Sequence, residues 1–148
     1  MCACTWYAQA QVVNEDFKIL PSDGTAYDYF GISIAIDKDI VAVGSSHDDP
    51  MGLDSGAAYL FDKATGEQLF KLVPKDGEAG DWFGAAIAIQ DSVVAVGSPY
   101  DDDGGPGSGS VYLFDAYTGM EISKLHASTT HSYSYDKFGC SVAIDNGM

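Results

Sequence analysis

The chain has 148 residues, of which 46% are hydrophobic, and 22 Asp and Glu residues against 7 Lys and Arg residues give it a formal charge of −15. This acidic excess excludes a surface that binds the phosphate backbone of nucleic acids, and it disfavours attachment to anionic membranes. Because no apolar run is long enough to span a bilayer, we expect neither a nucleic-acid partner nor membrane insertion. The charge suits divalent cations, basic partners or simply solubility.

Residues 1–26 are expected to form an N-terminal segment that contains part of a repeat unit. Phe17–Pro21 reads FKILP, and Phe70–Pro74, one period later, reads FKLVP. The segment Trp6–Pro21 therefore resembles the tail of a unit.

The first complete repeat is expected at residues 27–79, and it opens on the pair Phe30-Gly31. After this pair, alternating large and small residues predict a half-buried strand, and a β-branched run then predicts a central strand buried on both faces. A loop rich in Asp and Gly follows, and the last two strands flank a turn at Thr65-Gly66. The four expected strands are Ile32–Ile36, Ile40–Gly44, Ala57–Phe61 and Gln68–Val73.

The second complete repeat is expected at residues 80–134, in the same order as the first. It opens on Phe83-Gly84, and a third pair, Phe138-Gly139, opens a partial repeat at residues 135–148. The expected strands of the second repeat are Ala85–Ile89, Val93–Gly97, Ser110–Phe114 and Ile122–Leu125.

Four short antiparallel strands in each unit of roughly 50 residues are typical of a β-propeller blade. The sequence therefore predicts an all-β fold of propeller-type blades, with two complete repeats flanked by partial ones. A β-sandwich or a β-solenoid is the alternative, but a sandwich does not require a repeat of this length and solenoid rungs are usually shorter. Gly44 and Gly97 are expected where the backbone turns sharply or approaches a neighbouring blade.

These patterns resemble the FG-GAP repeat family, whose blades also build the head of integrin α chains. The words that carry the resemblance are the two Phe-Gly pairs, Val43–Ser45 (VGS), Val96–Pro99 (VGSP), Gly56–Phe61 (GAAYLF) and Gly109–Phe114 (GSVYLF). Integrin-type blades carry an Asp-x-Asp-x-Asp-Gly calcium loop between their first two strands, and the connections here are too short for it. The chain looks like the shorter microbial and algal variant.

The acidic residues instead gather between the second and third strands of each repeat. Ca²⁺ takes six to eight oxygen ligands from carboxylates, carbonyls and water, and the neighbouring glycines let a loop fold around an ion. The alternative is that these side chains cap turns by accepting backbone hydrogen bonds. The candidate calcium ligands are Asp48, Asp49, Asp54, Asp101, Asp102 and Asp103.

Other side chains recur at fixed positions of the repeat. Each Phe of a Phe-Gly pair is expected in the core between blades, and the Asp two residues earlier (Asp28, Asp81 and Asp136) is expected to bond backbone between neighbouring blades. The pairs Tyr27-Tyr29 and Tyr133-Tyr135 are either a surface that stacks on sugars or ordinary packing at strand edges.

Catalytic groupings are not evident in the sequence. His47, His126 and His131 have no metal-ligand spacing, and no nucleophile elbow, phosphate loop or dinucleotide fingerprint occurs. The sequence therefore predicts a protein that is not an enzyme. Cys2, Cys4 and Cys140 leave one thiol unpaired if a disulfide forms, and all three are free if none does.

Two functions remain open. The first is a non-enzymatic structural or adhesion module, extracellular or at the cell surface, whose partners are other copies of itself and also a glycan or another extracellular ligand. Such copies would join head to tail through their partial blades, into a ring or a filament. The alternative is a propeller fragment of a larger receptor or enzyme whose active site lies elsewhere.

Overall fold

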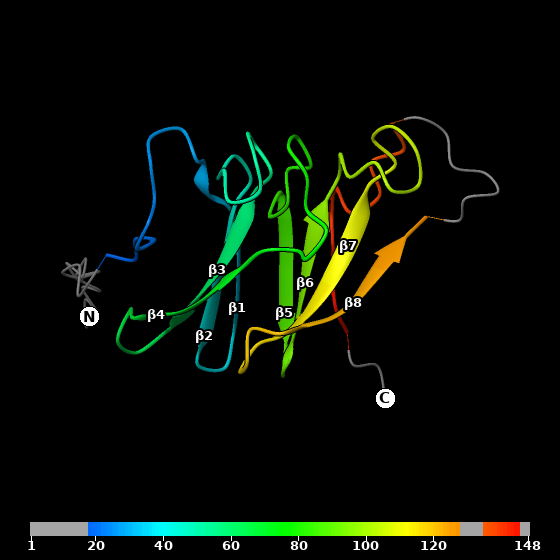
Figure 1. The fold of residues 1–148 in the computed structure, drawn as a ribbon. Helices are drawn as coiled ribbons and strands as arrows, with labels where there is room; N and C mark the ends of the chain where they lie inside the picture. Colours follow the sequence, from blue (N-terminus) through cyan, green and yellow to red (C-terminus); the bar gives the residue numbers. More distant parts are fainter. Residues whose placement is uncertain (1–17, 128–134, 146–148) are drawn as a thin grey trace, which may run out of the picture.

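The computed structural model describes residues 18–127 and 135–145, and these form two four-stranded antiparallel sheets with no helix (Figure 1). The expected all-β fold of two propeller-type blades is confirmed, and each expected strand is present. In both sheets the strands lie side by side in chain order. Blade 1 contains β1 (Phe30–Asp37), β2 (Ile40–Ser45), β3 (Ala57–Asp62) and β4 (Gln68–Leu72). Blade 2 contains β5 (Ala86–Gln90), β6 (Val93–Ser98), β7 (Ser110–Asp115) and β8 (Glu121–His126).

Short polar turns join the strands, as their residues predict. Lys38 and Asp91 adopt positive φ angles of 48° and 55° in the tight turn between the first two strands of each blade. In the last hairpin of blade 1, the carboxylate of Asp62 accepts backbone hydrogen bonds from Ala64 and Thr65. Asp115 repeats this arrangement in blade 2, so local turn chemistry sets the register of both sheets.

The main hydrophobic core lies between the two blades. Every residue of β2 is buried, as expected for a central strand covered on both faces. We call the face of a blade that is turned toward the preceding repeat its leading face, and the opposite face its trailing face. The trailing face of blade 1 consists of Ala42, Ala58, Leu60 and Leu72, and it packs against the leading face of blade 2, which consists of Phe83, Val94, Val96, Tyr112 and Phe114.

The joint between the blades depends on a close approach of backbone. A Cβ atom on Gly44 would lie 2.0 Å from the carbonyl oxygen of Gly84, and one on Gly56 would lie 2.0 Å from the carbonyl oxygen of Phe83. The Phe-Gly pair that opens blade 2 thus fits into a cradle formed by two glycines of blade 1. The expected approach of Gly44 to a neighbouring blade is confirmed. Gly97 approaches Gly139 in the same way, because a Cβ atom on Gly97 would lie 1.9 Å from the carbonyl oxygen of Gly139.

At the two outer ends, single segments cover parts of the faces that another blade would cover. Ile19 packs on the leading face of blade 1, in the position that Leu72 takes relative to blade 2. At the other end, residues 138–144 lie against the trailing face of blade 2 (Figure 1, red). In the ranges 18–127 and 135–145 there is no helix that could cross a membrane.

Candidate functional site

The acidic loops between the second and third strands of each blade hold the entrance of the next repeat. In blade 1, the carbonyl oxygens of Leu53, Asp54 and Ser55 accept hydrogen bonds from the backbone of residues 80, 82 and 83. In blade 2, residues 106–108 accept three hydrogen bonds from residues 135, 137 and 138 in the same way. These loops therefore act as a backbone clamp that positions the following Phe-Gly pair.

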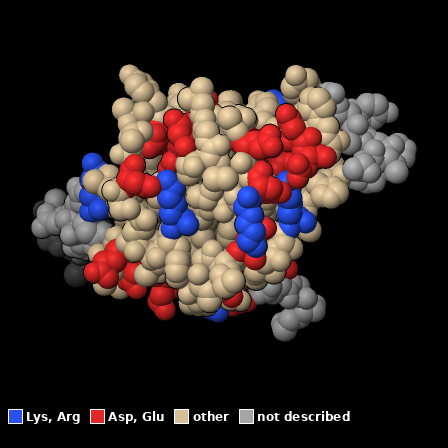
Figure 2. Space-filling view, viewed as in Figure 1, with Lys and Arg blue, Asp and Glu red and all other residues tan. Residues whose placement is uncertain are grey.

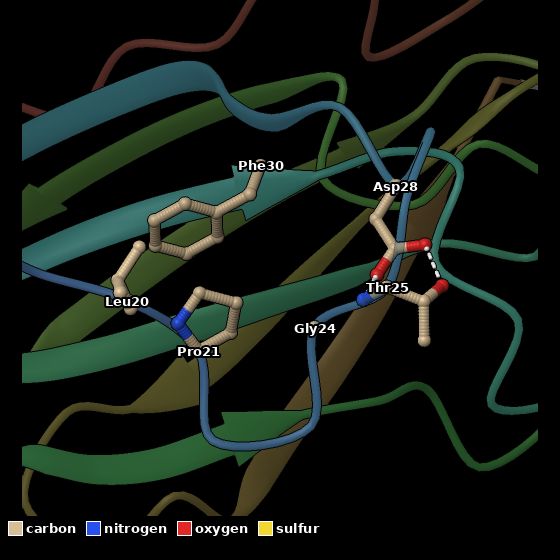
Figure 3. Close-up of a pocket in the computed structure, with 6 residues that line it drawn as sticks. All are labelled: Leu20, Pro21, Gly24, Thr25, Asp28 and Phe30. Atoms are coloured by element: carbon tan, nitrogen blue, oxygen red, sulfur yellow. Dashed lines mark hydrogen bonds between the residues drawn. The ribbon is translucent and has the colours of Figure 1, made fainter.

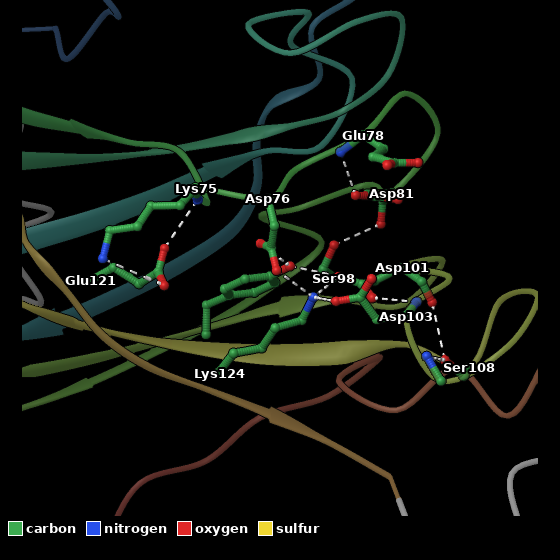
Figure 4. Close-up of polar contacts among 12 residues, drawn as sticks. Lys75, Asp76, Glu78, Asp81, Ser98, Asp101, Asp103, Ser108, Glu121 and Lys124 are labelled. Atoms are coloured by element: carbon green, nitrogen blue, oxygen red, sulfur yellow. Dashed lines mark hydrogen bonds and ion pairs between the residues drawn. The ribbon is translucent and has the colours of Figure 1, made fainter. Parts of the chain in front are cut away.

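In blade 2, the predicted ligand Asp101 belongs to a buried cluster with Tyr112 and Lys124 (Figure 4). Its carboxylate is 2% exposed and lies 2.6 Å from the Tyr112 hydroxyl and 2.8 Å from the Lys124 ammonium. The carboxylates of Asp76 and Asp103 also bind this ammonium. One ammonium group thus contacts three carboxylates around a buried tyrosine.

The pKa values of this cluster reflect its charges. Burial alone would lower the pKa of Lys124, but its bonds to the three carboxylates raise it above the ordinary value. Burial and the bond to Asp101 raise the pKa of Tyr112, so the phenol stays protonated as a donor. Burial would raise the pKa of Asp76, but the bonds from Lys124 and Tyr112 hold it below 3.8.

Blade 1 repeats the cluster with Asp48, Tyr59, Lys71 and Asp23. The Tyr59 hydroxyl donates to Asp48 and to Asp23, the latter at 2.9 Å. The Lys71 ammonium lies 3.1 Å from Asp48 and 2.7 Å from Asp23. Because both blades build the same cluster, it is part of the repeat.

The other predicted calcium ligands mostly hold their own loops. The carboxylate of Asp49 accepts a 2.7 Å hydrogen bond from the Asp54 backbone, and Asp102 accepts one from Gly107. In residues 18–127 and 135–145, no group of three or more His, Cys, Asp or Glu side chains has an arrangement that could hold a metal ion. The turn-capping alternative describes these contacts of Asp49 and Asp102, and calcium binding by the six aspartates stays a prediction.

Two of the recurring aspartates before the Phe-Gly pairs, Asp28 and Asp81, act within their own turns. The carboxylate of Asp28 accepts a 2.7 Å hydrogen bond from the Thr25 hydroxyl, and that of Asp81 accepts one from the Glu78 backbone. Their carbonyl oxygens accept from the hydroxyls of Ser45 and Ser98, both at 2.9 Å. These contacts differ from the expectation that the carboxylates bond a neighbouring blade: each lies at the entrance of its own blade.

The burial of Asp81 predicts a pH-dependent stability. Burial, with a smaller effect from nearby carboxylates, raises the pKa of Asp81 to about 6. Because the folded state holds this proton more tightly than the unfolded chain, the free energy of unfolding falls as the pH rises from about 4 through about 6. We expect Asp81→Asn to remove this slope and to stabilise the protein by about 1–2 kcal/mol at pH 8.

Urea unfolding at pH 5, 6 and 8 measures this effect. Asp115→Asn is the matched control, because hydrogen bonds from Thr118 lower the pKa of Asp115 and both states are ionised over this range. A slope that persists in Asp81→Asn would contradict the assignment.

A ladder of aromatic rings crosses both blades on the side of these loops. Ring centroids are 4.3 Å apart for Tyr29 and His47, 4.8 Å for His47 and Trp82, and 4.5 Å for Trp82 and Tyr100. The Lys137 ammonium then lies 4.7 Å from the Tyr100 ring and donates to its hydroxyl. Sequence reasoning missed this aromatic ladder, although its members recur either just before a Phe-Gly pair or two residues after a Gly-Ser pair.

The other tyrosines and histidines that the sequence singled out lie in different environments. Tyr27 is 87% exposed and Tyr135 is 66% exposed, and Tyr133 lies outside the described residues. His47 stacks in the aromatic ladder, and His131 is likewise outside the described part. The Asp48 carboxylate binds Tyr59 and Lys71, and the Nδ1 of His47 lies 2.9 Å from the Ser46 hydroxyl oxygen.

Two shallow cavities mark the outer ends of the blade stack. One of 260 Å³ is bounded by Leu20, Pro21, Gly24, Thr25, Asp28 and Phe30 at the entrance of blade 1 (Figure 3). The other, of 250 Å³, separates the trailing face of blade 2 from residues 138–144. In the inter-blade joint, the corresponding surfaces are packed into the core. Among residues 18–127 and 135–145, both cavities therefore lie at blade faces that are incompletely covered.

The surface charge is uneven. In the view of Figure 2, acidic side chains gather over the loop end of blade 2, and lysines lie in a row beneath the acidic groups. The lysines are mostly engaged by carboxylates, as the pairs of Lys71 and Lys124 show. The net surface therefore remains acidic.

The comparison with protein families agrees with this architecture. A family model described as FG-GAP repeat matches residues 13–61 and 67–114, and its second match runs from the start of β4 to the end of β7. No curated protein matches the chain. The crystal structure of the computationally designed Ika4 protein matches 75% of this chain and 80% of its own, at 16% identity and a TM-score of 0.30.

The computationally designed Ika8 protein matches 71% of the chain at 16% identity and a TM-score of 0.28, and the chain covers 38% of its length. The two family matches cover well over half of the sequence. The first includes β1, β2 and β3 of blade 1, and the second includes β4 of blade 1 with strands β5, β6 and β7 of blade 2. The chain belongs to the FG-GAP repeat family.

Proposed function

We propose that this protein is a non-enzymatic structural or adhesion module of the extracellular space or cell surface, and that its copies stack head to tail. FG-GAP repeats form propeller-like modules that are often extracellular and generally non-catalytic. The observation that carries the proposal is the joint at each end of the stack, which the described part of the chain leaves incomplete. Each end presents one side of an interface that is complete between blades 1 and 2.

The physical reason for assembly is the apolar surface at these ends. Blade 1 exposes Ile32, Ile34 and Ile36 on β1, and Leu125 of blade 2 is 46% exposed at the other end. Since the two ends differ, a contact between copies is heterologous and gives a ring or a filament according to the rotation at each step. Stacking would also cover the open edges of the apolar cores.

The alternative is that further blades of a larger receptor or enzyme cover the same two ends. The incomplete joints favour this reading equally, since a blade of the same polypeptide fits them as well as a blade of another copy. In that case the site of activity lies in another part of the larger protein, and this chain contributes two blades to its propeller.

Light scattering of the purified chain over a range of concentrations separates these functions. We expect a mass that rises to multiples of the monomer, whereas a monomer at every concentration would contradict self-assembly and favour the alternative. The same measurement in calcium and then in excess chelator tests the acidic loops. If they bind calcium, chelator lowers the thermal midpoint or the assembled mass; an unchanged protein contradicts the calcium site.

An extracellular ligand or glycan remains part of this proposal. The aromatic ladder from Tyr29 to Tyr100 is the surface where half-exposed rings are concentrated, and aromatic side chains combine an apolar body with a polar tip. Binding to immobilised glycans, compared between the wild-type chain and Tyr29→Ala, measures this part of the proposal.

A further inference from the structure

Three isoleucines of β1 form an exposed apolar row on the leading side of blade 1. Ile32, Ile34 and Ile36 are 53%, 61% and 59% exposed. In blade 2, the positions of Ile34 and Ile36 are occupied by Ile87 and Ile89, which lie in the core between the blades. The row is therefore the same surface as one side of the internal joint.

In the internal joint, β1 of blade 1 supplies the surface that covers Ile87 and Ile89. Ala35 packs in the same core, and the Ser33 hydroxyl donates a 2.7 Å hydrogen bond to the carbonyl oxygen of Gly84. The carboxylate of Asp37 accepts a 2.6 Å hydrogen bond from the backbone of Asp91. Small side chains at alternate positions, with an Asp at the end of the strand, thus form the other side of the joint.

The segment at the opposite end of the stack carries these same residues. Phe138–Asp145 reads FGCSVAID, and Phe30–Asp37 reads FGISIAID. Residues 141–144 line the cavity against blade 2, where Val142 and Ile144 are half-buried. Ser141, Ala143 and Asp145 are exposed in the positions of Ser33, Ala35 and Asp37. One end of the described blade stack therefore exposes the isoleucine side of a joint, and the other end exposes its small-residue side.

We infer that β1 of one copy docks on residues 138–145 of a second copy. Ile34 and Ile36 pack on Ala143, the Ser141 hydroxyl donates to the carbonyl oxygen of Gly31, and the Asp145 carboxylate accepts from the backbone of Lys38. Each contact repeats one that exists between blades 1 and 2. Residues 138–145 carry the same pattern as β1, the strand that makes these contacts in the internal joint, so we take a second copy of this chain as the occupant. This inference rests on the proposed self-assembly and names the surfaces that join.

Charge substitutions at the two surfaces test this joint. Ile34→Glu and Ala143→Glu each place a carboxylate in the contact, and we expect each to weaken association at least tenfold. Ile122→Glu is the matched control, because Ile122 is 55% exposed on β8 and lies outside the joint; we expect a change of less than twofold. Sedimentation velocity measures the association, and circular dichroism verifies that each variant folds.

Mixing the two variants is the decisive measurement. Ile34→Glu keeps an intact small-residue surface and Ala143→Glu keeps an intact isoleucine row, so the equimolar mixture should form a dimer that does not grow. If the wild-type chain and Ile34→Glu assemble equally well, the inferred joint is wrong, but the proposed self-assembly is still supported. No dimer in the mixture would overturn the inferred joint also, and a wild-type chain that stays monomeric would overturn both.

Discussion

Gly44→Ala is expected to destabilise the protein by about 3 kcal/mol and to lower its thermal midpoint by roughly 10 °C. The added Cβ would lie 2.0 Å from the carbonyl oxygen of Gly84 and 2.3 Å from the Ser33 hydroxyl oxygen. The carbonyl belongs to the backbone of the neighbouring blade, so it moves only if the blades separate. Thermal and urea unfolding of the two proteins measure the difference.

Two other glycines provide controls for this prediction. Gly105 has nothing within 4 Å of an added Cβ but has a φ of 127°, so Gly105→Ala reports backbone strain alone, at about 1 kcal/mol. Gly97→Ala clashes with Gly139 and displaces residues 138–145 without touching the joint between blades 1 and 2. A loss in Gly44→Ala no larger than that in Gly105→Ala would show that the approach of the two blades does not limit stability.

Lys124→Met is expected to cost about 3 kcal/mol, because it leaves the buried Asp101 carboxylate without its cation. Asp101 is 2% exposed and would keep the Tyr112 hydroxyl as a side-chain donor. Lys75→Met is the matched control. Lys75 is 75% exposed and lies 3.8 Å from Glu121, so its loss should change the free energy of unfolding by less than about 0.5 kcal/mol.

The stabilisation that Lys124 and its carboxylate partners provide depends on pH. The lowered pKa of Asp76 contributes stability above about pH 4, which is lost as the pH falls through the folded pKa. The raised pKa of Lys124 contributes stability below about pH 10, which is lost as the pH rises through the folded pKa. The difference between wild type and Lys124→Met in urea unfolding should therefore be largest near neutral pH and shrink below about pH 4. A difference that does not change between pH 3 and pH 7 would contradict the ionic role.

The sequence was sufficient for the blade architecture because the repeat supplies the same local information twice. The alternation in Ile32–Ile36 and the β-branched run in Ile40–Gly44 each predict a strand from their own residues. Turn residues such as Asp62 and Gly66 then place the hairpins. Gly44 could be assigned to a close approach of a neighbouring blade, because glycine weakens the interior of a strand and usually marks such an approach.

The partners of the aspartates in the acidic loops could not be predicted from the sequence. Asp48 and Asp101 are adjacent to other aspartates in the sequence, which predicts a shared cation site. Their partners Tyr59 and Lys71, or Tyr112 and Lys124, come from other strands, and only the sheet register brings these side chains to the carboxylates. The calcium prediction could not take these partners into account.

The sequence by itself determined local features: the strands, the turns, the repeat, and the family that the motifs FG and VGS indicate. What the tertiary structure decided was pairing across blades, namely the glycine cradle that receives Phe83-Gly84, the lysine that neutralises each buried aspartate, and the aromatic ladder from Tyr29 to Tyr100. Local propensity depends on neighbours within a few residues, whereas these contacts join residues that stacking alone brings together. The exposed row of Ile34 and Ile36 follows for the same reason, since a blade's faces are assigned only when its neighbours are in place.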